Sequence, residues 1–237
     1  MSGQFRYDGN MGFTRASILL TDTEDERQIM VQRKEIHDRV LAATSTDELM
    51  AFYGEWAELY DHDLIDELGY VAPVMAATVL QQHLTMAEPA ILDAGCGTGL
   101  VGEVLHREGF TRLDGLDYST EMLARAEQKK IYGTLLHEDM TGPLDIADDR
   151  YDAVISVGTF TCGHVGPTGL YELVRITKPS GLICFTVREQ AWQEDDYHRV
   201  LTNLQTQKRW QQRELRPAPY IQDEGSTCMI GCFQVLD

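Results

Sequence analysis

Basic residues are scarce in this chain of 237 residues. It contains 20 Lys and Arg residues against 38 Asp and Glu residues, which gives a formal net charge of -18 at pH 7. Nucleic-acid backbones and anionic membrane surfaces are bound by clustered Lys and Arg side chains, so this balance disfavours both kinds of partner. The acidic balance suits a small substrate, especially a cationic or neutral one. We therefore expect a small-molecule partner, with no nucleic acid and no membrane.

Cysteines and long apolar runs are also few. The five cysteines are odd in number and have no framework spacing, which is typical of a reduced intracellular protein. This pattern predicts a cytoplasmic location, with the nucleus as the alternative. The longest apolar stretch, residues 71–80, contains Pro73 and cannot span a bilayer. The run at residues 17–20 is too short for a secretory signal.

The chain changes its pattern near residue 88. Residues 1–44 are predicted to form a flexible or helical arm, and residues 45–237 a single domain. Within this domain, helical spacing of apolar residues predicts a helical lid over residues 45–87. Strands and helices then alternate over residues 88–237, which predicts a sheet core.

The strands and helices of this core can be placed from their boundaries. Strands are expected at residues 90–94, 113–117, 133–137, 151–157, 182–187, 210–215 and 227–236, and helices at residues 100–108, 120–129, 169–177 and 195–208. A turn at residues 178–181 should separate a helix from the next strand. Helical crossovers imply parallel strands, and the last two strands should form an antiparallel pair at the sheet edge. The predicted fold class is α/β, with a mostly parallel seven-stranded sheet and helices on both faces.

The segment ILDAGCGTG, from Ile91 to Gly99, is the most informative part of the chain. A short apolar run ends in Asp93, three glycines follow at alternate positions, and a helical pattern begins at Leu100. This order predicts a strand, a tight loop and a helix N-terminus, a common site for a nucleotide-like ligand. A carboxylate at the strand tip would repel a diphosphate but attract an ammonium or sulfonium group.

The same loop also contains a G-x-G-x-x-G pattern, formed by Gly97, Gly99 and Gly102. This pattern alone leaves open a nicotinamide-dependent oxidoreductase, although extra loop residues separate the strand from its first glycine. Asp117 ends the next expected strand, about 20 residues further on. Its carboxylate could accept two hydrogen bonds from ribose hydroxyls, or it could cap a helix or face solvent. The spacing favours the ribose interpretation.

Taken together, four segments resemble the motifs of the class I S-adenosylmethionine-dependent methyltransferases. They are Asp93–Gly99, Leu116–Ser119 with Met122, Glu138–Met140 and Tyr151–Ser156. The resemblance covers residues 88–188 and implies a Rossmann-like fold, S-adenosylmethionine as cofactor, and methyl transfer. The alternative is a non-catalytic cofactor-binding or scaffold protein, because no catalytic base is unmistakable.

The resemblance also implies a set of cofactor-binding residues. They are Trp56, Tyr60, Asp93, Gly95, Cys96, Gly97, Gly99, Asp117, Tyr118, Met122, Asp139, Met140 and Val157. In the family, the carboxylate corresponding to Asp93 faces the methionine amino group, Asp117 corresponds to the ribose ligand, and Asp139 to the acceptor of the adenine amino group. Met122 and Met140 would pack on the adenine ring, although either could be an ordinary core residue.

The residues before the core narrow the resemblance. Residues 52–63, 69–73 and 157–165 are similar to the methyltransferase-like protein 27 subgroup, the Williams–Beuren syndrome region type. In residues 52–63, Trp56 and Tyr60 share one helix face. They could cover the cofactor and exclude water, or they could dock the helix on the core.

His164 is the candidate catalytic base. It follows the fourth expected strand, at the carboxyl end of the sheet where ligands of open α/β folds bind. A histidine titrates near neutral pH and can accept a proton from a hydroxyl or ammonium acceptor. The alternative is a histidine that only hydrogen-bonds the loop, because methyl transfer does not always require a base. The acceptor is expected to be a small molecule, and no metal is predicted.

Overall fold

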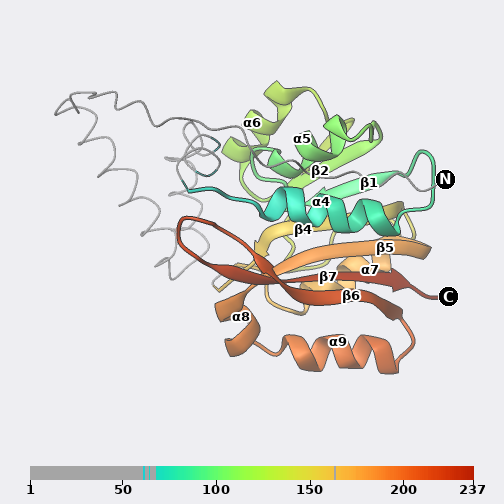
Figure 1. Cartoon of the computed structure of the whole chain (residues 1–237). Coiled ribbons are helices and arrows are strands. Elements are labelled where there is room, and N and C mark those ends of the chain that lie inside the picture. The colour runs from blue at the N-terminus through green and yellow to red at the C-terminus, as the bar shows by residue number, and fades with distance from the viewer. Residues whose placement is uncertain (1–60, 62–63, 65–67, 163) are drawn as a thin grey trace, which may run out of the picture.

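The computed structural model describes residues 61, 64, 68–162 and 164–237 (Figure 1). The predicted arm at residues 1–44, most of the predicted lid, and with it Trp56 and Tyr60, lie outside the described residues. The described helices are α4 (Ala72–His83), α5 (Leu100–Arg107), α6 (Thr120–Lys129), α7 (Gly169–Ile176), α8 (Glu189–Glu194) and α9 (Tyr197–Thr206). The strands are β1 (Ile91–Ala94), β2 (Leu113–Asp117), β3 (Thr134–His137), β4 (Tyr151–Phe160), β5 (Thr177–Arg188), β6 (Trp210–Pro219) and β7 (Thr227–Val235).

These strands form one sheet in the order β3-β2-β1-β4-β5-β7-β6. Strands β1 to β5 pair in parallel, whereas β7 pairs antiparallel with both β5 and β6. The predicted fold class, a mostly parallel seven-stranded α/β sheet, is confirmed. The chain first adds strands on one side of β1 and then crosses to β4 on the other side. A crevice at such a switch point, outside the carboxyl ends of the strands, is where ligands bind in open α/β folds.

Helices pack on both faces of the sheet (Figure 1). On one face, Leu80 of α4 and Leu105 of α5 share a buried cluster with Ile91 of β1. On the other face, Leu173 of α7 belongs to a second buried cluster that includes Leu92. Because side chains alternate along a strand, Asp93 lies on the same face of β1 as Ile91, under α5. No helix in the described part of the chain is long and apolar enough to cross a bilayer.

Two elements differ from the sequence-based expectation. Strand β5 begins at Thr177, so the expected turn at residues 178–181 lies inside the strand as an irregularity, with Ser180 at a φ of 65°. The second difference is α8, which was not predicted. It has six residues and buries only Ala191, so it leaves no apolar periodicity in the sequence.

Candidate functional site

The loop after β1 depends on glycine. Gly95, Gly97 and Gly99 have φ values of 77°, 53° and 93°, in the left-handed region that side chains disfavour. At Gly95 a Cβ atom would also lie 2.0 Å from the Thr159 side-chain hydroxyl at the end of β4. The loop can therefore pass close to β4 only because this residue has no side chain. Gly99 then becomes the N-cap of α5.

Asp93 is a buried carboxyl group at the carboxyl end of β1. Asp93 is 1% exposed, and its Oδ2 accepts a hydrogen bond of 2.6 Å from the Tyr132 hydroxyl. Its Oδ1 is buried and has no hydrogen-bond partner among the described residues. Burial raises the pKa of Asp93 to about 7, against the lowering effect of the Tyr132 hydrogen bond. Such a half-satisfied buried acid is costly to stability and is typical of a ligand site.

Asp117 ends β2 and fastens the neighbouring loop. Its Oδ2 accepts a hydrogen bond of 2.7 Å from the Gly97 N–H, and its Oδ1 accepts one of 2.9 Å from the Ser119 N–H. Burial raises the pKa of this carboxyl, against these hydrogen bonds to the anionic form. Each carboxylate oxygen can accept a second hydrogen bond, so ribose hydroxyls could still be bound. Asp117 therefore serves the loop and stays available to a ligand.

Asp139 follows the end of β3, the next strand along the sheet. It is exposed, and its Oδ1 accepts a hydrogen bond of 2.8 Å from the Thr141 N–H. Asp117 pairs in register with His137, two residues before Asp139. The three acids predicted to bind the cofactor therefore lie at, or just after, the carboxyl ends of three adjacent strands, β1, β2 and β3. That they act on successive parts of one ligand remains a prediction.

The remaining predicted cofactor residues are less uniform in position. Met140 is 4% exposed and lies in the core cluster on the α7 face, whereas Met122 is 3% exposed at the start of α6. Tyr118 is 41% exposed and stacks on His137. Cys96 packs on Leu123 and Ala126, and Val157 belongs to the α4-side core. A contact of each with the adenine or the methionine part remains a prediction.

An ionic cluster that sequence reasoning missed lies behind the loop. The Lys129 ammonium contacts Asp61 Oδ2 at 2.6 Å and Glu103 Oε2 at 2.7 Å, and the Thr98 hydroxyl donates to Asp61 Oδ1. This ionic cluster joins the ends of α5 and α6 to Asp61, which precedes the core. No sequence motif predicts the cluster, because its members are separated by up to 68 residues.

His164 lies in the loop after β4, as predicted. Its Nδ1 is 2.7 Å from the Thr161 hydroxyl oxygen and 3.3 Å from the Cys162 carbonyl oxygen. Burial lowers the pKa of His164, and the nearby Arg188 lowers it further, so the imidazole is neutral at pH 7. Cys162 is exposed as a residue. Partial burial of its thiol and the nearby Glu194 carboxylate both raise the pKa of that thiol. Cys162 is therefore not an activated nucleophile.

Two tyrosines meet beside the end of β4, and no motif predicted this pair. The Tyr70 and Tyr220 rings pack edge to face at 5.1 Å, and their hydroxyl oxygens are 3.5 Å apart. Gly158 has a φ of 81°, and a Cβ atom there would lie 2.9 Å from the Tyr70 hydroxyl. Arg188, at the end of β5, has its guanidinium 5.6 Å from the centre of the Tyr220 ring. Arg188 connects this group to His164, whose pKa its charge lowers, and β4 and β5 lie on the opposite side of β1 from the strand that carries Asp117.

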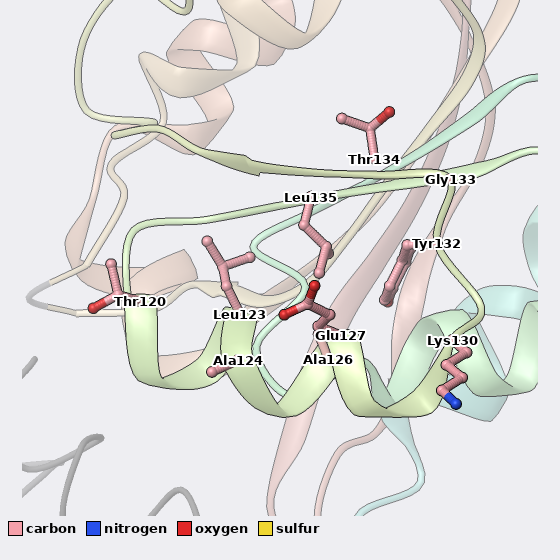
Figure 2. A pocket seen from close by; sticks show the side chains of 10 residues that line it. All are labelled: Thr120, Leu123, Ala124, Ala126, Glu127, Lys130, Tyr132, Gly133, Thr134 and Leu135. Atoms are coloured by element: carbon pink, nitrogen blue, oxygen red, sulfur yellow. The ribbon is translucent and has the colours of Figure 1, made fainter.

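A separate cavity of about 560 Å³ lies between α6 and β3, at the edge of the sheet (Figure 2). It is lined by Thr120, Leu123, Ala124, Ala126, Glu127, Lys130, Tyr132, Gly133, Thr134 and Leu135. None of the described residues that are predicted to bind the cofactor lines it. Tyr132 is common to both places, because its ring borders this cavity while its hydroxyl reaches Asp93.

Comparison with known proteins connects this geometry to a family. Residues 91–181 match the family model described as a methyltransferase domain. The human methyltransferase-like protein 27 is 39% identical over 160 residues, which cover 65% of this chain and 64% of that protein. The chain spans less than two thirds of the length of the curated relatives that it matches first.

Solved structures show the same fold at lower identity. The [4+2]-cyclase SpnF aligns with a TM-score of 0.64 at 13% identity, covering 82% of this chain and 97% of that one. The 1,6-didemethyltoxoflavin-N1-methyltransferase of Burkholderia thailandensis aligns with a TM-score of 0.57 at 16% identity, covering 82% and 92%. That enzyme's structure contains 1,6-didemethyltoxoflavin and S-adenosylhomocysteine. These alignments establish the fold of the described core.

Proposed function

We propose that this chain is a class I S-adenosylmethionine-dependent methyltransferase that transfers the cofactor's methyl group to a small-molecule acceptor. The match of residues 91–181 to a methyltransferase-domain model, the similarity to methyltransferase-like protein 27 and the fold support this proposal. S-adenosylmethionine is the cofactor of this family. The observation that supports the proposal most is Asp93, a buried carboxyl group with one oxygen lacking a partner among the described residues. It suits the ammonium of an amino-acid nucleoside and would repel a diphosphate.

The proposed cofactor site follows the strand order. Asp93 would accept from the methionine ammonium, while the loop from Gly95 to Gly99 would lie against the methionine and ribose. Asp117 would accept from the ribose hydroxyls, and Asp139 from the adenine amino group. Trp56 and Tyr60 stay predictions outside the described residues. When bound, the cofactor would supply a methyl group on a sulfonium, and the chain's task is alignment and exclusion of water.

We place the acceptor on the other side of the crevice, near His164, Tyr70 and Tyr220. The net charge of -18 makes nucleic acid an improbable acceptor and is compatible with a small molecule. His164 is neutral at pH 7, so it could take the proton of a hydroxyl acceptor as the new bond to the methyl carbon forms, or the proton of an ammonium acceptor before its nitrogen lone pair attacks that carbon. A thiolate or neutral amine would need no such base, and His164 would then only hold the loop through Thr161.

A non-catalytic cofactor-binding role is the second candidate. The same fold occurs in a protein named as a [4+2]-cyclase, so the fold alone does not imply methyl transfer. Incubation with labelled S-adenosylmethionine and a broad metabolite mixture separates the two candidates. Label in a metabolite supports transfer, whereas tight binding without any labelled product supports the second role. The proposed compartment is a reducing one, since all five cysteines are free thiols.

Isothermal titration with S-adenosylhomocysteine tests the cofactor assignment directly. We expect binding at micromolar ligand, and replacement of Asp117 by Ala should weaken it by about tenfold or more because charged hydrogen bonds to the ribose are lost. The same variant should weaken 5′-methylthioadenosine equally, because both ligands contain the ribose. Asp114→Ala, in the same strand but bonded to Tyr151, is the control. No heat from the wild type at high micromolar ligand would contradict the proposal.

A further inference from the structure

Tyr132 lies between α6 and β3 and contacts the carboxyl end of β1 from behind. Its hydroxyl donates to Asp93 Oδ2 at 2.6 Å, although the two residues are 39 positions apart. Burial and the adjacent Asp93 raise the pKa of Tyr132 far above its usual value. The hydroxyl therefore keeps its proton at physiological pH and acts as a permanent donor. Figure 2 shows the ring entering from the loop that precedes β3.

Room for the Tyr132 ring comes from glycines in two neighbouring elements. At Gly102 in α5, a Cβ atom would lie 2.2 Å from the Tyr132 hydroxyl oxygen. At Gly99 it would lie 3.1 Å from the ring, and at Gly115 in β2 it would lie 3.3 Å from the ring. The third glycine of the G-x-G-x-x-G pattern therefore accommodates a tyrosine. Gly102 thus gives the nicotinamide hypothesis no support of its own.

Within the described part of the chain, the two oxygens of Asp93 differ, because Oδ2 accepts the Tyr132 hydrogen bond and Oδ1 has no partner. Apart from burial and Tyr132, the groups that affect the pKa of Asp93 are Asp117, which raises it, and the nearby Gly102 backbone and Lys129, which lower it. Asp93 in turn raises the pKa of the Cys96 thiol. The Lys129 ammonium contacts Asp61 and Glu103 at 2.6 and 2.7 Å. Lys129 is thus paired with other acids, and Asp93 Oδ1 has no hydrogen-bond donor among the described residues. A buried acceptor of this kind favours a ligand that brings a cationic donor.

We propose that Tyr132 is a positioning residue that holds the Asp93 carboxylate so that Oδ1 receives the ammonium of the cofactor's amino-acid part. The inference rests on the proposed function. It goes further by assigning ligand discrimination to this pair. A nucleoside thioether that lacks the amino-acid part gains nothing from Asp93, so the pair selects the complete amino-acid nucleoside.

Two ligands and two variants test this assignment. S-adenosylhomocysteine and 5′-methylthioadenosine share the adenine, the ribose and the sulfur, but only the first has the ammonium. Tyr132→Phe keeps the ring between the glycines and removes the hydroxyl. We expect the dissociation constant for S-adenosylhomocysteine to rise about tenfold, and that for 5′-methylthioadenosine to change less than twofold. Tyr151→Phe is the matched control, because its hydroxyl donates to Asp114 outside the site at 3.1 Å.

The pH dependence provides a second readout. The Tyr132 hydrogen bond lowers the pKa of Asp93, so its loss should shift the rise of S-adenosylhomocysteine affinity between pH 6 and pH 8 toward higher pH. Equal weakening of both ligands with an unshifted pH profile, or no weakening at all, would overturn the inference alone. Failure of the wild type to bind S-adenosylhomocysteine would overturn the proposed function with it.

Discussion

Replacing Gly95 with alanine should abolish S-adenosylhomocysteine binding and lower the free energy of unfolding by about 3 kcal/mol. Two effects add. The residue has a φ of 77°, which disfavours any side chain, and its Cβ atom would lie 2.0 Å from the Thr159 hydroxyl oxygen and 3.0 Å from its methyl carbon. The Gly95 N–H also donates to the Leu116 carbonyl oxygen at 2.7 Å, so a displaced loop would disturb β2. Chemical denaturation and titration calorimetry measure both effects.

Gly109 offers the control for Gly95. It has a φ of 95°, but a Cβ atom there would meet nothing within 4 Å. Gly109→Ala should therefore cost about 1 kcal/mol of stability through the backbone alone and leave ligand binding intact. In the double variant Gly95→Ala with Thr159→Ala, removal of the obstructing side chain should restore part of the lost stability. Indistinguishable behaviour of the two single variants would refute the argument from the close approach to β4.

Replacing Asp93 with asparagine should produce opposite changes in binding and stability. Affinity for S-adenosylhomocysteine should fall by about a hundredfold, because the ligand's ammonium loses a buried anionic partner. Affinity for 5′-methylthioadenosine should hardly change. The ligand-free variant should be more stable than the wild type above pH 7, since the buried charge is removed.

The pH window follows from the raised pKa. The unfolded chain loses this proton near pH 4, whereas the folded protein keeps it until about pH 7. Within that window the folded state binds more protons, so the wild-type free energy of unfolding falls as pH rises, by about 4 kcal/mol in total from this group. The stability gain of Asp93→Asn should grow from pH 4 to pH 7 and then level off. Asp149→Asn is the control, because Asp149 is exposed. A stability gain of Asp93→Asn that stays constant with pH would contradict the raised pKa of Asp93.

The strands and the acids at their ends could be predicted from the sequence, because local hydrophobic patterns determine them. Asp93, Asp117 and Asp139 each follow an apolar strand, and parallel pairing of consecutive strands aligns their carboxyl ends, so their common edge could be predicted. The irregular start of β5 could not be predicted, because Pro179 and Ser180 belong to a turn-forming sequence. Pairing with β4 places this sequence within the strand. The short helix α8 has too few buried residues to produce a period.

Side-chain contacts between segments far apart in the chain could not be predicted from the sequence pattern. Tyr132 precedes β3 without any motif, and its role emerges only because Gly99, Gly102 and Gly115 leave space for its ring. Lys129 belongs to no motif either, yet it contacts two acids from separate segments. His164 lies in the loop after β4, as predicted, but its contact with Thr161 and the influence of Arg188 on its pKa could be found only from the folded loop. The assignment of Trp56 and Tyr60 remains a prediction.

In the proposed site, ligand capture at Asp93 would be linked to proton release. With a pKa of about 7, this group is protonated in about half of the molecules at neutral pH, and only its anionic form can pair with an ammonium. Each capture would therefore release about half a proton to the buffer on average. Mild acidification would loosen the cofactor at constant concentration, which makes occupancy of the crevice responsive to acidity without a dedicated sensor.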